Sequence, residues 1–346
     1  MTPLEKIITR MILDDGPMPL DRYMSLCLSH PEHGYYMTRD PLGAAGDFTT
    51  SPEISQVFGE LIGVWVAQVW QQLGSPRSFA LVELGPGRGT LMMDVLRVLK
   101  KVPACAKAVE VHLVETSPVL RALQLERVPD ATWHGTVASL PGLPSIILSN
   151  EFFDALPIRQ FERIKGAVFE RVVGQGLSIG LVPSAMRLPL SGDGVFEDSS
   201  VRDALALQLG DHLVKSSGAA LVIDYGHLRT SAGDTLQAMK AHQFCKITDR
   251  PGEADVTSHV DFEALGRGFM RGGAKVVGAM TQGSFLLRMG LEARTKVLAA
   301  GSTGDKQRDV IAASERLANV TQMGDLFKVM AVTGGLQASP YPFGHT

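Results

Sequence analysis

The sequence predicts an α/β fold built on a doubly wound, mostly parallel sheet. Short apolar runs that alternate with helical segments are typical of parallel strands covered on both faces. These runs are Phe79–Leu84, Val109–Val114, Ser145–Asn150 and Ala219–Tyr225. Helical spacing follows the first run over Thr90–Lys100 and the second over Pro118–Glu126. This βαβ alternation favours an open sheet with helices on both sides.

The first 75 residues are predicted to be mainly helical, ahead of a larger domain over residues 76–346. A helix is expected over Ile54–Leu73, because Gly74 and Pro76 then end it. Residues 30–52 have no clear period and contain many Gly, Pro, Asp and Thr residues. Irregular loops longer than about 12–15 residues are usually functional or disordered, so this loop is a candidate functional segment.

Residues 158–200 break the strand–helix alternation and are interpreted as an insertion in the larger domain. The pattern over Ile158–Ser184 indicates β-hairpins, and helical spacing returns over residues 201–215. Beyond Val260 we expect a helix and two further strands, Ala274–Met280 and Phe327–Val332, at the edge of the sheet.

Composition and charge exclude several classes of protein. The 346 residues include 33 basic and 36 acidic side chains, which gives a net charge of −3 and argues against a nucleic-acid binder driven by bulk electrostatics. With 45% hydrophobic and 20% charged residues, the chain is neither disordered nor collagen-like. Its most apolar window, Leu61–Trp70, is too short to span a bilayer.

The cysteines and the N-terminus predict a cytoplasmic protein of a bacterium. Cys27, Cys105 and Cys245 are scattered, which favours a reducing compartment over disulfides or a thiolate zinc site. The N-terminus reads neither as a secretory signal nor as a transit peptide. His30 and His33 flank a proline without a third ligand nearby, so we assign no metal.

A glycine-rich turn, LVELGPGRGTL over Leu81–Leu91, is the sharpest local signal. Gly85, Gly87 and Gly89 lie between a strand and a helix, where glycine permits positive φ and close approach of a ligand to the backbone. A glycine turn alone is weak evidence, because many α/β proteins use one structurally. In its strand–turn–helix context it indicates a cofactor site.

The charge beside this turn indicates which cofactor it suits. Glu83 would oppose the pyrophosphate of a dinucleotide and would favour an ammonium or sulfonium group. Glu115 ends the next strand, where a carboxylate can accept hydrogen bonds from both ribose hydroxyls. A cation that carries a ribose is S-adenosylmethionine. The alternative for Glu115 is a charge at the start of the helix after Ser117.

Several long motifs occur in one order along most of the chain. They are GDFTTSPEISQVFGE (46–60), VELGPGRGTL (82–91), HLVETSP (112–118), SNEFFDALP (149–157), VIDYGH (222–227) and QMGDLFKVMAV (322–332). With these motifs the chain resembles the MidA-like family of class I methyltransferases, which includes the mitochondrial complex I assembly-factor arginine methyltransferase.

The resemblance implies a seven-stranded methyltransferase sheet and S-adenosylmethionine as methyl donor. It also implies symmetric dimethylation of an arginine in a protein substrate, a peripheral-arm subunit of respiratory complex I. By the same resemblance, the segment Gly46–Glu53 folds over the donor as a lid, with Gly46, Thr50 and Ser51 at the cofactor. The alternative is a simple helix N-cap.

Acidic and aromatic residues follow the strand Ser145–Asn150, at the carboxyl edge where ligands bind. Asn150 is assigned to the cofactor site, and Glu151 and Asp154 are candidates to hold a cationic, planar acceptor through paired hydrogen bonds. The alternative is that the two phenylalanines between these acids are core residues and that Asp154 caps a helix.

The end of the next strand adds two candidate catalytic residues, Asp224 and His227. His227 could act as a base, because an unperturbed imidazole titrates near pH 6.5. The alternative is that Asp224 and Tyr225 only brace the sheet edge.

Four functions remain open from the residues and the resemblance. The leading hypothesis is a protein-arginine methyltransferase that acts in complex I assembly. The others are a methyltransferase for a small molecule or another side chain, a non-catalytic assembly chaperone that binds the donor, and a Rossmann dehydrogenase.

Overall fold

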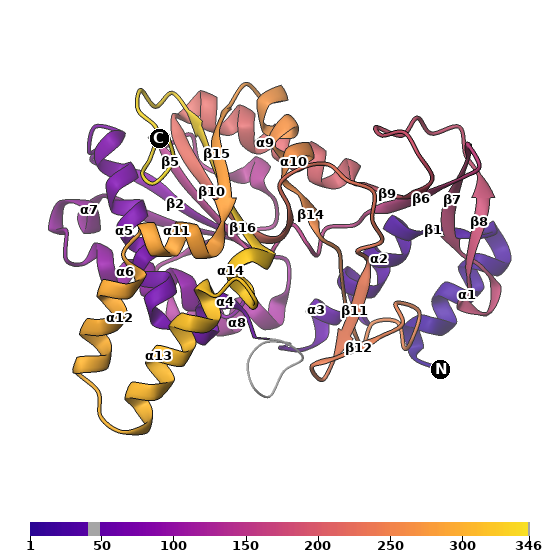
Figure 1. The fold of residues 1–346 in the computed structure, drawn as a ribbon, viewed down its shortest axis with the longest axis horizontal. Coiled ribbons are helices and arrows are strands. Elements are labelled where there is room, and N and C mark those ends of the chain that lie inside the picture. Colours follow the sequence, from indigo (N-terminus) through magenta and orange to yellow (C-terminus); the bar gives the residue numbers. More distant parts are fainter. Residues whose placement is uncertain (41–48, 345–346) are drawn as a thin grey trace.

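The central sheet of the computed structural model, which describes residues 1–40 and 49–344, has the expected α/β architecture (Figure 1). Its strand order is β15 (Lys275–Thr281), β16 (Phe327–Gly334), β10 (Gly218–His227), β5 (Ser145–Asn150), β2 (Phe79–Leu84), β3 (Val109–Val114) and β4 (Thr132–His134). Strands β10 to β4 are parallel, and β16 is antiparallel to both of its neighbours. The short β14 (Val260–Asp261) pairs with β10 as an eighth strand.

All six predicted strands of this sheet form, three of them with the bounds read from the sequence, and β15 lies at the edge as predicted. The prediction that Phe327–Val332 is an edge strand is wrong, because β16 lies between β10 and β15. Its residues are almost all buried, as a central strand requires.

Helices cover both faces of this sheet because its central strands carry apolar side chains on both sides. Phe79 and Leu81 of β2 pack with α5 (Gln56–Gln72) and α6 (Thr90–Leu99). Ala80 and Val82 of the same strand face α9 (Ser200–Ser216) and α10 (Phe262–Arg271). Two connecting helices, α7 (Pro103–Ala108) and α8 (Pro118–Arg127), complete the βαβ units.

The insertion forms a separate antiparallel sheet, as its hairpin pattern predicts. It contains β1 (Met18–Pro19), β6 (Arg159–Ile164), β7 (Ala167–Val173), β8 (Ile179–Pro183) and β9 (Gly194–Asp198). Helices α1 (Pro3–Asp15) and α2 (Leu20–Ser29) lie against it and share a third core with it (Figure 1). The first 75 residues therefore contribute to two cores, since α5 packs on the main sheet; the division at residue 75 stays a prediction.

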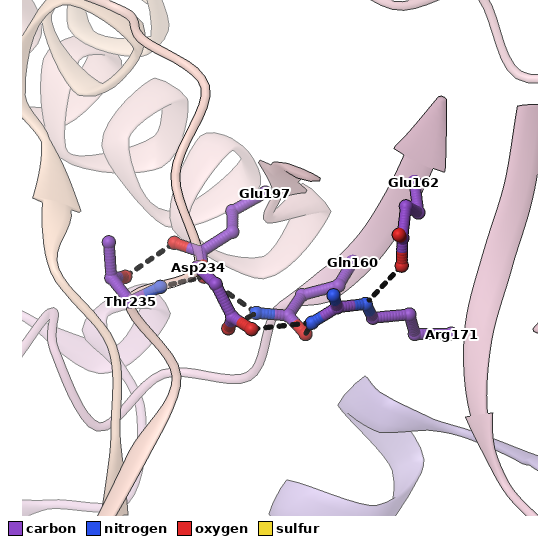
Figure 2. A network of polar contacts seen from close by, with 6 residues as sticks. All are labelled: Gln160, Glu162, Arg171, Glu197, Asp234 and Thr235. Atoms are coloured by element: carbon purple, nitrogen blue, oxygen red, sulfur yellow. Dashed lines mark hydrogen bonds and ion pairs between the residues drawn. The ribbon is translucent and has the colours of Figure 1, made fainter. Parts of the chain in front are cut away.

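A polar network fixes the inserted sheet to the segment that leads into the small sheet of β11 (Gln237–Lys240), β12 (Gln243–Cys245) and β13 (Asp255–Thr257). In Figure 2, Arg171 contacts Glu162 and Asp234, at 3.0 and 2.6 Å. The Gln160 amide lies 2.8 Å from both Asp234 and Glu197, and Glu197 also accepts two hydrogen bonds from Thr235. The two bonds to Asp234 join residues that are 74 and 63 positions apart in sequence.

The C-terminal helices α11 (Gln282–Arg288), α12 (Leu291–Ala300), α13 (Asp305–Ala318) and α14 (Met323–Leu326) precede β16, and α12 and α13 project from the sheet (Figure 1). Arg294 of α12 holds Glu60 of α5 through two contacts of 2.6 and 3.0 Å. The remaining short helices, α3 (Tyr35–Thr38) and α4 (Ser51–Ile54), border the residues that are not described. No helix in the described part has the length and apolar character needed to cross a membrane.

We predict that Arg294→Met destabilises the fold by about 1–3 kcal/mol, because it leaves the carboxylate of Glu60, which is 7% exposed, without its cation. The matched control is Arg10→Met, which breaks an exposed pair with Asp14 and should cost less than about 1 kcal/mol. Urea unfolding at neutral pH measures both. Equal losses in the two variants would contradict this account of α12.

Candidate active site

A cavity of about 420 Å³ lies at the carboxyl ends of β2, β3 and β5. It is lined by the glycine turn, by the residues after β3, β4 and β5, by part of α9, and by the N-terminal segments around α2, α3 and α4. Ligands of open α/β sheets bind at this edge, so the cavity is the candidate active site.

The glycine turn adopts the conformation that its sequence predicts. Gly85, Gly87 and Gly89 have φ values of 57°, 53° and 81°, and Gly89 directly precedes α6. A Cβ at Gly85 would lie 2.6 Å from the ring of Phe152. Glycine is therefore required here both for backbone conformation and for contact with the loop after β5.

Glu83 places an unusual charge in the cavity wall. Its side chain is 3% exposed and Oε2 has no hydrogen-bond partner among the described residues. Burial raises the pKa of Glu83 to about 8, although a backbone hydrogen bond from Met92 opposes the shift. A carboxylate in this state is stabilised by a cation brought into the cavity.

Glu115 lies at the end of β3 and also lines the cavity. Its Oε1 accepts the backbone N–H groups of Thr116 and Ser117, at 2.8 and 2.7 Å, so it also serves the start of α8. Gln124 donates to Oε2 at 3.3 Å and to the carbonyl of Gly87 at 2.7 Å. Burial raises the pKa of Glu115. Glu115 thus lines the cavity and also accepts hydrogen bonds at the start of α8, and its role in cofactor binding stays a prediction.

The loop after β5 presents Glu151 and Asn150 to the same cavity. Glu151 has a φ of 50°, and its Oε1 accepts from the backbone N–H of Ser51 and from Nδ2 of Asn150, both at 3.1 Å. Desolvation raises the pKa of Glu151 to about 8, with a further contribution from Asp154. Oδ1 of Asn150 is buried and unpaired within the described chain.

Two predicted catalytic acids lie behind this loop, outside the cavity lining. Asp224 is fully buried, and its Oδ2 accepts the backbone N–H groups of residues 152, 153 and 154 at 3.0–3.2 Å. Asp154 accepts from the hydroxyl of Tyr225 at 2.5 Å. Burial and the neighbouring Asp154 raise the pKa of Asp224 well above its ordinary value. The arrangement corresponds to the alternative in which Asp224 braces the sheet edge.

The structure does not bring His227 to the cavity, so its predicted place there is wrong. Strand β10 continues past Tyr225 and pairs with β14, which carries His227 beyond the edge. His227 instead lines a second cavity of about 270 Å³ between the inserted sheet, α9 and α10. Its Nε2 lies 3.9 Å from Oδ2 of Asp261.

Of the three predicted lid residues, Gly46, Thr50 and Ser51, only Thr50 is in the lining of the cavity as described. Gly46 lies outside the described residues. Thr50 lines the cavity and precedes α4, and Ser51 is buried and bonded to Glu151.

Sequence reasoning missed several polar residues of the cavity lining, among them Tyr36, Glu53 and Arg88. Glu53 accepts from the hydroxyl of Thr90 at 2.5 Å, and Arg88 lies within the glycine turn itself. The position of Arg88 between two glycines of the predicted cofactor turn was the available signal. Tyr36 and Glu53 lie in a segment without periodicity.

The residues present fit S-adenosylmethionine. The unpaired oxygens of Glu83 and Asn150 can accept hydrogen bonds from an ammonium group, and Glu115 lies where a ribose would meet the end of β3. Four glutamates and a single cation, Arg88, line the described cavity, and this excess of acid disfavours a pyrophosphate. Fold and cavity define a class I S-adenosylmethionine-dependent methyltransferase. No three metal-ligating side chains gather anywhere in residues 1–40 and 49–344.

Comparison with known proteins agrees with this class. A family described as "Putative S-adenosyl-L-methionine-dependent methyltransferase" matches residues 61–280. A mitochondrial protein of Drosophila melanogaster named protein arginine methyltransferase NDUFAF7 homolog is 36% identical, over 97% of this chain and 86% of its own. The human protein arginine methyltransferase NDUFAF7 is 34% identical, over 96% and 83%. This chain therefore belongs to the MidA-like family of class I methyltransferases.

A solved structure extends the agreement to the whole fold and to the cofactor. A Burkholderia thailandensis protein crystallised with S-adenosyl-homocysteine superposes with a TM-score of 0.86 at 25% identity, covering 97% of this chain and 93% of that one. S-adenosyl-homocysteine is the product that remains when the donor has lost its methyl group. The predicted cofactor, S-adenosylmethionine, is thus confirmed for the family.

We predict that donor binding strengthens as the pH rises through about 8 and releases protons below that pH, because a bound cation favours the ionised form of Glu83. Glu83→Gln should weaken binding roughly 10-fold or more and reduce the number of protons released. Titration calorimetry in two buffers of different ionisation heat measures both quantities. Unchanged proton release would contradict this role of Glu83.

The same variant should stabilise the ligand-free protein. The pKa of Glu83 rises from 4.5 to about 8 on folding, so its ionisation destabilises the fold increasingly across this window. Thermal unfolding of Glu83→Gln against the natural protein should show a gain that grows with pH between these values. A gain that is constant with pH would point to a packing effect instead.

Proposed function

We propose that the protein is a protein-arginine N-methyltransferase. The observation that carries this proposal is the excess of acid in the cavity, where Glu53, Glu83, Glu115 and Glu151 face one guanidinium, that of Arg88. The donor brings a sulfonium, an ammonium and a carboxylate, and so only one net positive charge. The remaining acid favours a second cation, and an arginine side chain supplies one that stays charged at all relevant pH values.

Glu151 is the proposed contact with the acceptor. Both hydrogen bonds that it accepts within the described chain go to Oε1, which leaves Oε2 for the guanidinium of the substrate. A carboxylate that pairs with two of the three nitrogens orients the third toward the reacting carbon and localises the positive charge away from it. Asp154 and Asp224 act through the loop and are proposed as positioning residues.

When bound, S-adenosylmethionine supplies a methyl group on a positively charged sulfur. The acceptor nitrogen forms a bond to this methyl carbon, the carbon–sulfur bond breaks, and its electron pair stays on the sulfur. The methylated guanidinium then loses one proton, and Glu151 is proposed to take it from one of the two nitrogens that it holds. Its pKa of about 8 lets it accept and release a proton near neutral pH.

The acceptor is proposed to be a protein. The names of the Drosophila and human relatives, both protein arginine methyltransferases, support arginine as the residue. The family resemblance supports the narrower proposal of symmetric dimethylation of a respiratory complex I subunit during assembly.

We predict that Glu151→Gln lowers kcat for arginine methylation roughly 100-fold or more while the affinity for the donor changes little. In the natural protein the rate should rise with pH toward about 8, as Glu151 ionises, and the variant should lose that rise. Labelled-methyl transfer measures the rate and calorimetry the affinity. Glu126→Gln, an exposed carboxylate on α8, is the matched control and should behave as the natural protein.

The acceptor is tested by mass spectrometry of the proteome with and without the gene. The expected result is the loss of dimethylarginine at one or a few sites, in a complex I subunit. Loss of a methyl group from lysine, glutamine or a small molecule would overturn the arginine proposal. A normal methylome, with donor binding intact, would favour an assembly chaperone.

A further inference from the structure

We infer that Arg88 binds the carboxylate of the donor's methionine moiety. Arg88 lies at the third residue after Gly85 within the glycine turn, and it is the one cationic side chain among the described residues that line the cavity. The donor carries a single anionic group, its α-carboxylate. In a cavity whose other charged groups are glutamates, Arg88 is the side chain that can neutralise that group.

The surroundings of Arg88 hold its guanidinium in place for this contact. Nε donates to Oδ2 of Asp40 at 2.7 Å, and NH1 lies 3.7 Å from Oε2 of Glu53. The Arg88 side chain is 22% exposed, so these pairs are largely shielded from water. A guanidinium has five N–H donors in a fixed plane and can hold more than one carboxylate at once.

The flanking acids also complement the other half of an amino-acid group. An α-amino acid presents an ammonium beside its carboxylate, so a recognition site needs an acid next to the cation. Glu53 lies beside Arg88, and Glu83 lines the same cavity. The carboxylate of the donor would be the third on Arg88, after those of Asp40 and Glu53. The donor brings its own ammonium group with it, and the neighbouring glutamates can bind that ammonium.

The backbone of the turn is fixed independently of this side chain. Arg127 of α8 donates from NH1 to the carbonyl of Arg88 at 2.9 Å and to the hydroxyl of Thr90 at 3.2 Å. Arg127 does not line the cavity. It therefore offers a control that touches the same turn without reaching the ligand.

The test compares two ligands that differ by the carboxylate alone: S-adenosylmethionine and its decarboxylated analogue. Calorimetry on the full chain should show that Arg88→Met weakens binding of S-adenosylmethionine roughly 10- to 100-fold and changes binding of the analogue by less than about threefold. Arg88→Lys keeps the positive charge but loses the paired N–H donors of the guanidinium. Its affinity for S-adenosylmethionine should therefore lie between those of the natural protein and Arg88→Met.

Arg127→Met should change the affinity for both ligands by a similar factor, because it acts on the turn. Equal losses of both ligands in Arg88→Met, in a protein whose thermal unfolding stays cooperative, would overturn the inference and leave Arg88 as a structural tie to Asp40 and Glu53. The readout is donor binding alone, so it is independent of whether the acceptor is arginine.

Discussion

The shape of the cavity depends on one buried carboxylate, that of Asp224. It accepts the three successive N–H groups that follow Glu151, and a fourth from the backbone of Tyr225. Three donors on one oxygen require a tight turn directly after β5. This turn holds Glu151 at a positive φ, a conformation that costs a non-glycine residue about 1 kcal/mol and persists only where its surroundings impose it.

The same turn is held from its other side by a buried cation. Arg202 of α9 donates to the carbonyl of Asp154 at 3.0 Å and to the carbonyl of His259 at 2.9 Å, and it is only 7% exposed. A buried acid and a buried arginine thus hold one short segment between β10 and α9. Loss of Asp224 or Arg202 would displace Glu151 even though neither side chain lines the cavity. Both are therefore positioning residues for this loop.

Sequence reasoning located the residues that end parallel strands, because strand ends and the cavity coincide in this fold. Glu83, Glu115 and Glu151 were found in this way, and the structure places all three in the lining of one cavity. It failed for His227, because the pairing of β10 with β14 is a contact between distant segments that extends the strand. Sequence reasoning also missed the C-terminal helices before β16. That segment carries no local motif as distinct as the glycine turn.

The N-terminal contribution to the cavity was unpredictable for a related reason. Tyr36 and Glu53 lie in a stretch without periodicity, and their positions are set by partners remote in sequence, Asp255 and Thr90. Nothing local indicates such partners. Periodicity along the sequence shows which side chains of a segment are buried. It does not show which polar residues will lie opposite one another across a cavity, because that depends on contacts between remote segments.

The raised pKa values of Glu83 and Glu151 share one cause, and this links the two ligands of the proposed reaction. Each carboxylate is desolvated, so each is stabilised in its charged form by positive charge brought nearby. A cation bound in this cavity would act on both groups, because both line it. On the proposed mechanism, donor binding would therefore favour ionised Glu151 before the acceptor arrives. The positive charge of the donor would thus promote ionisation of Glu151, the proposed base. The same charge would have little effect on acids exposed to water, because water screens the interaction.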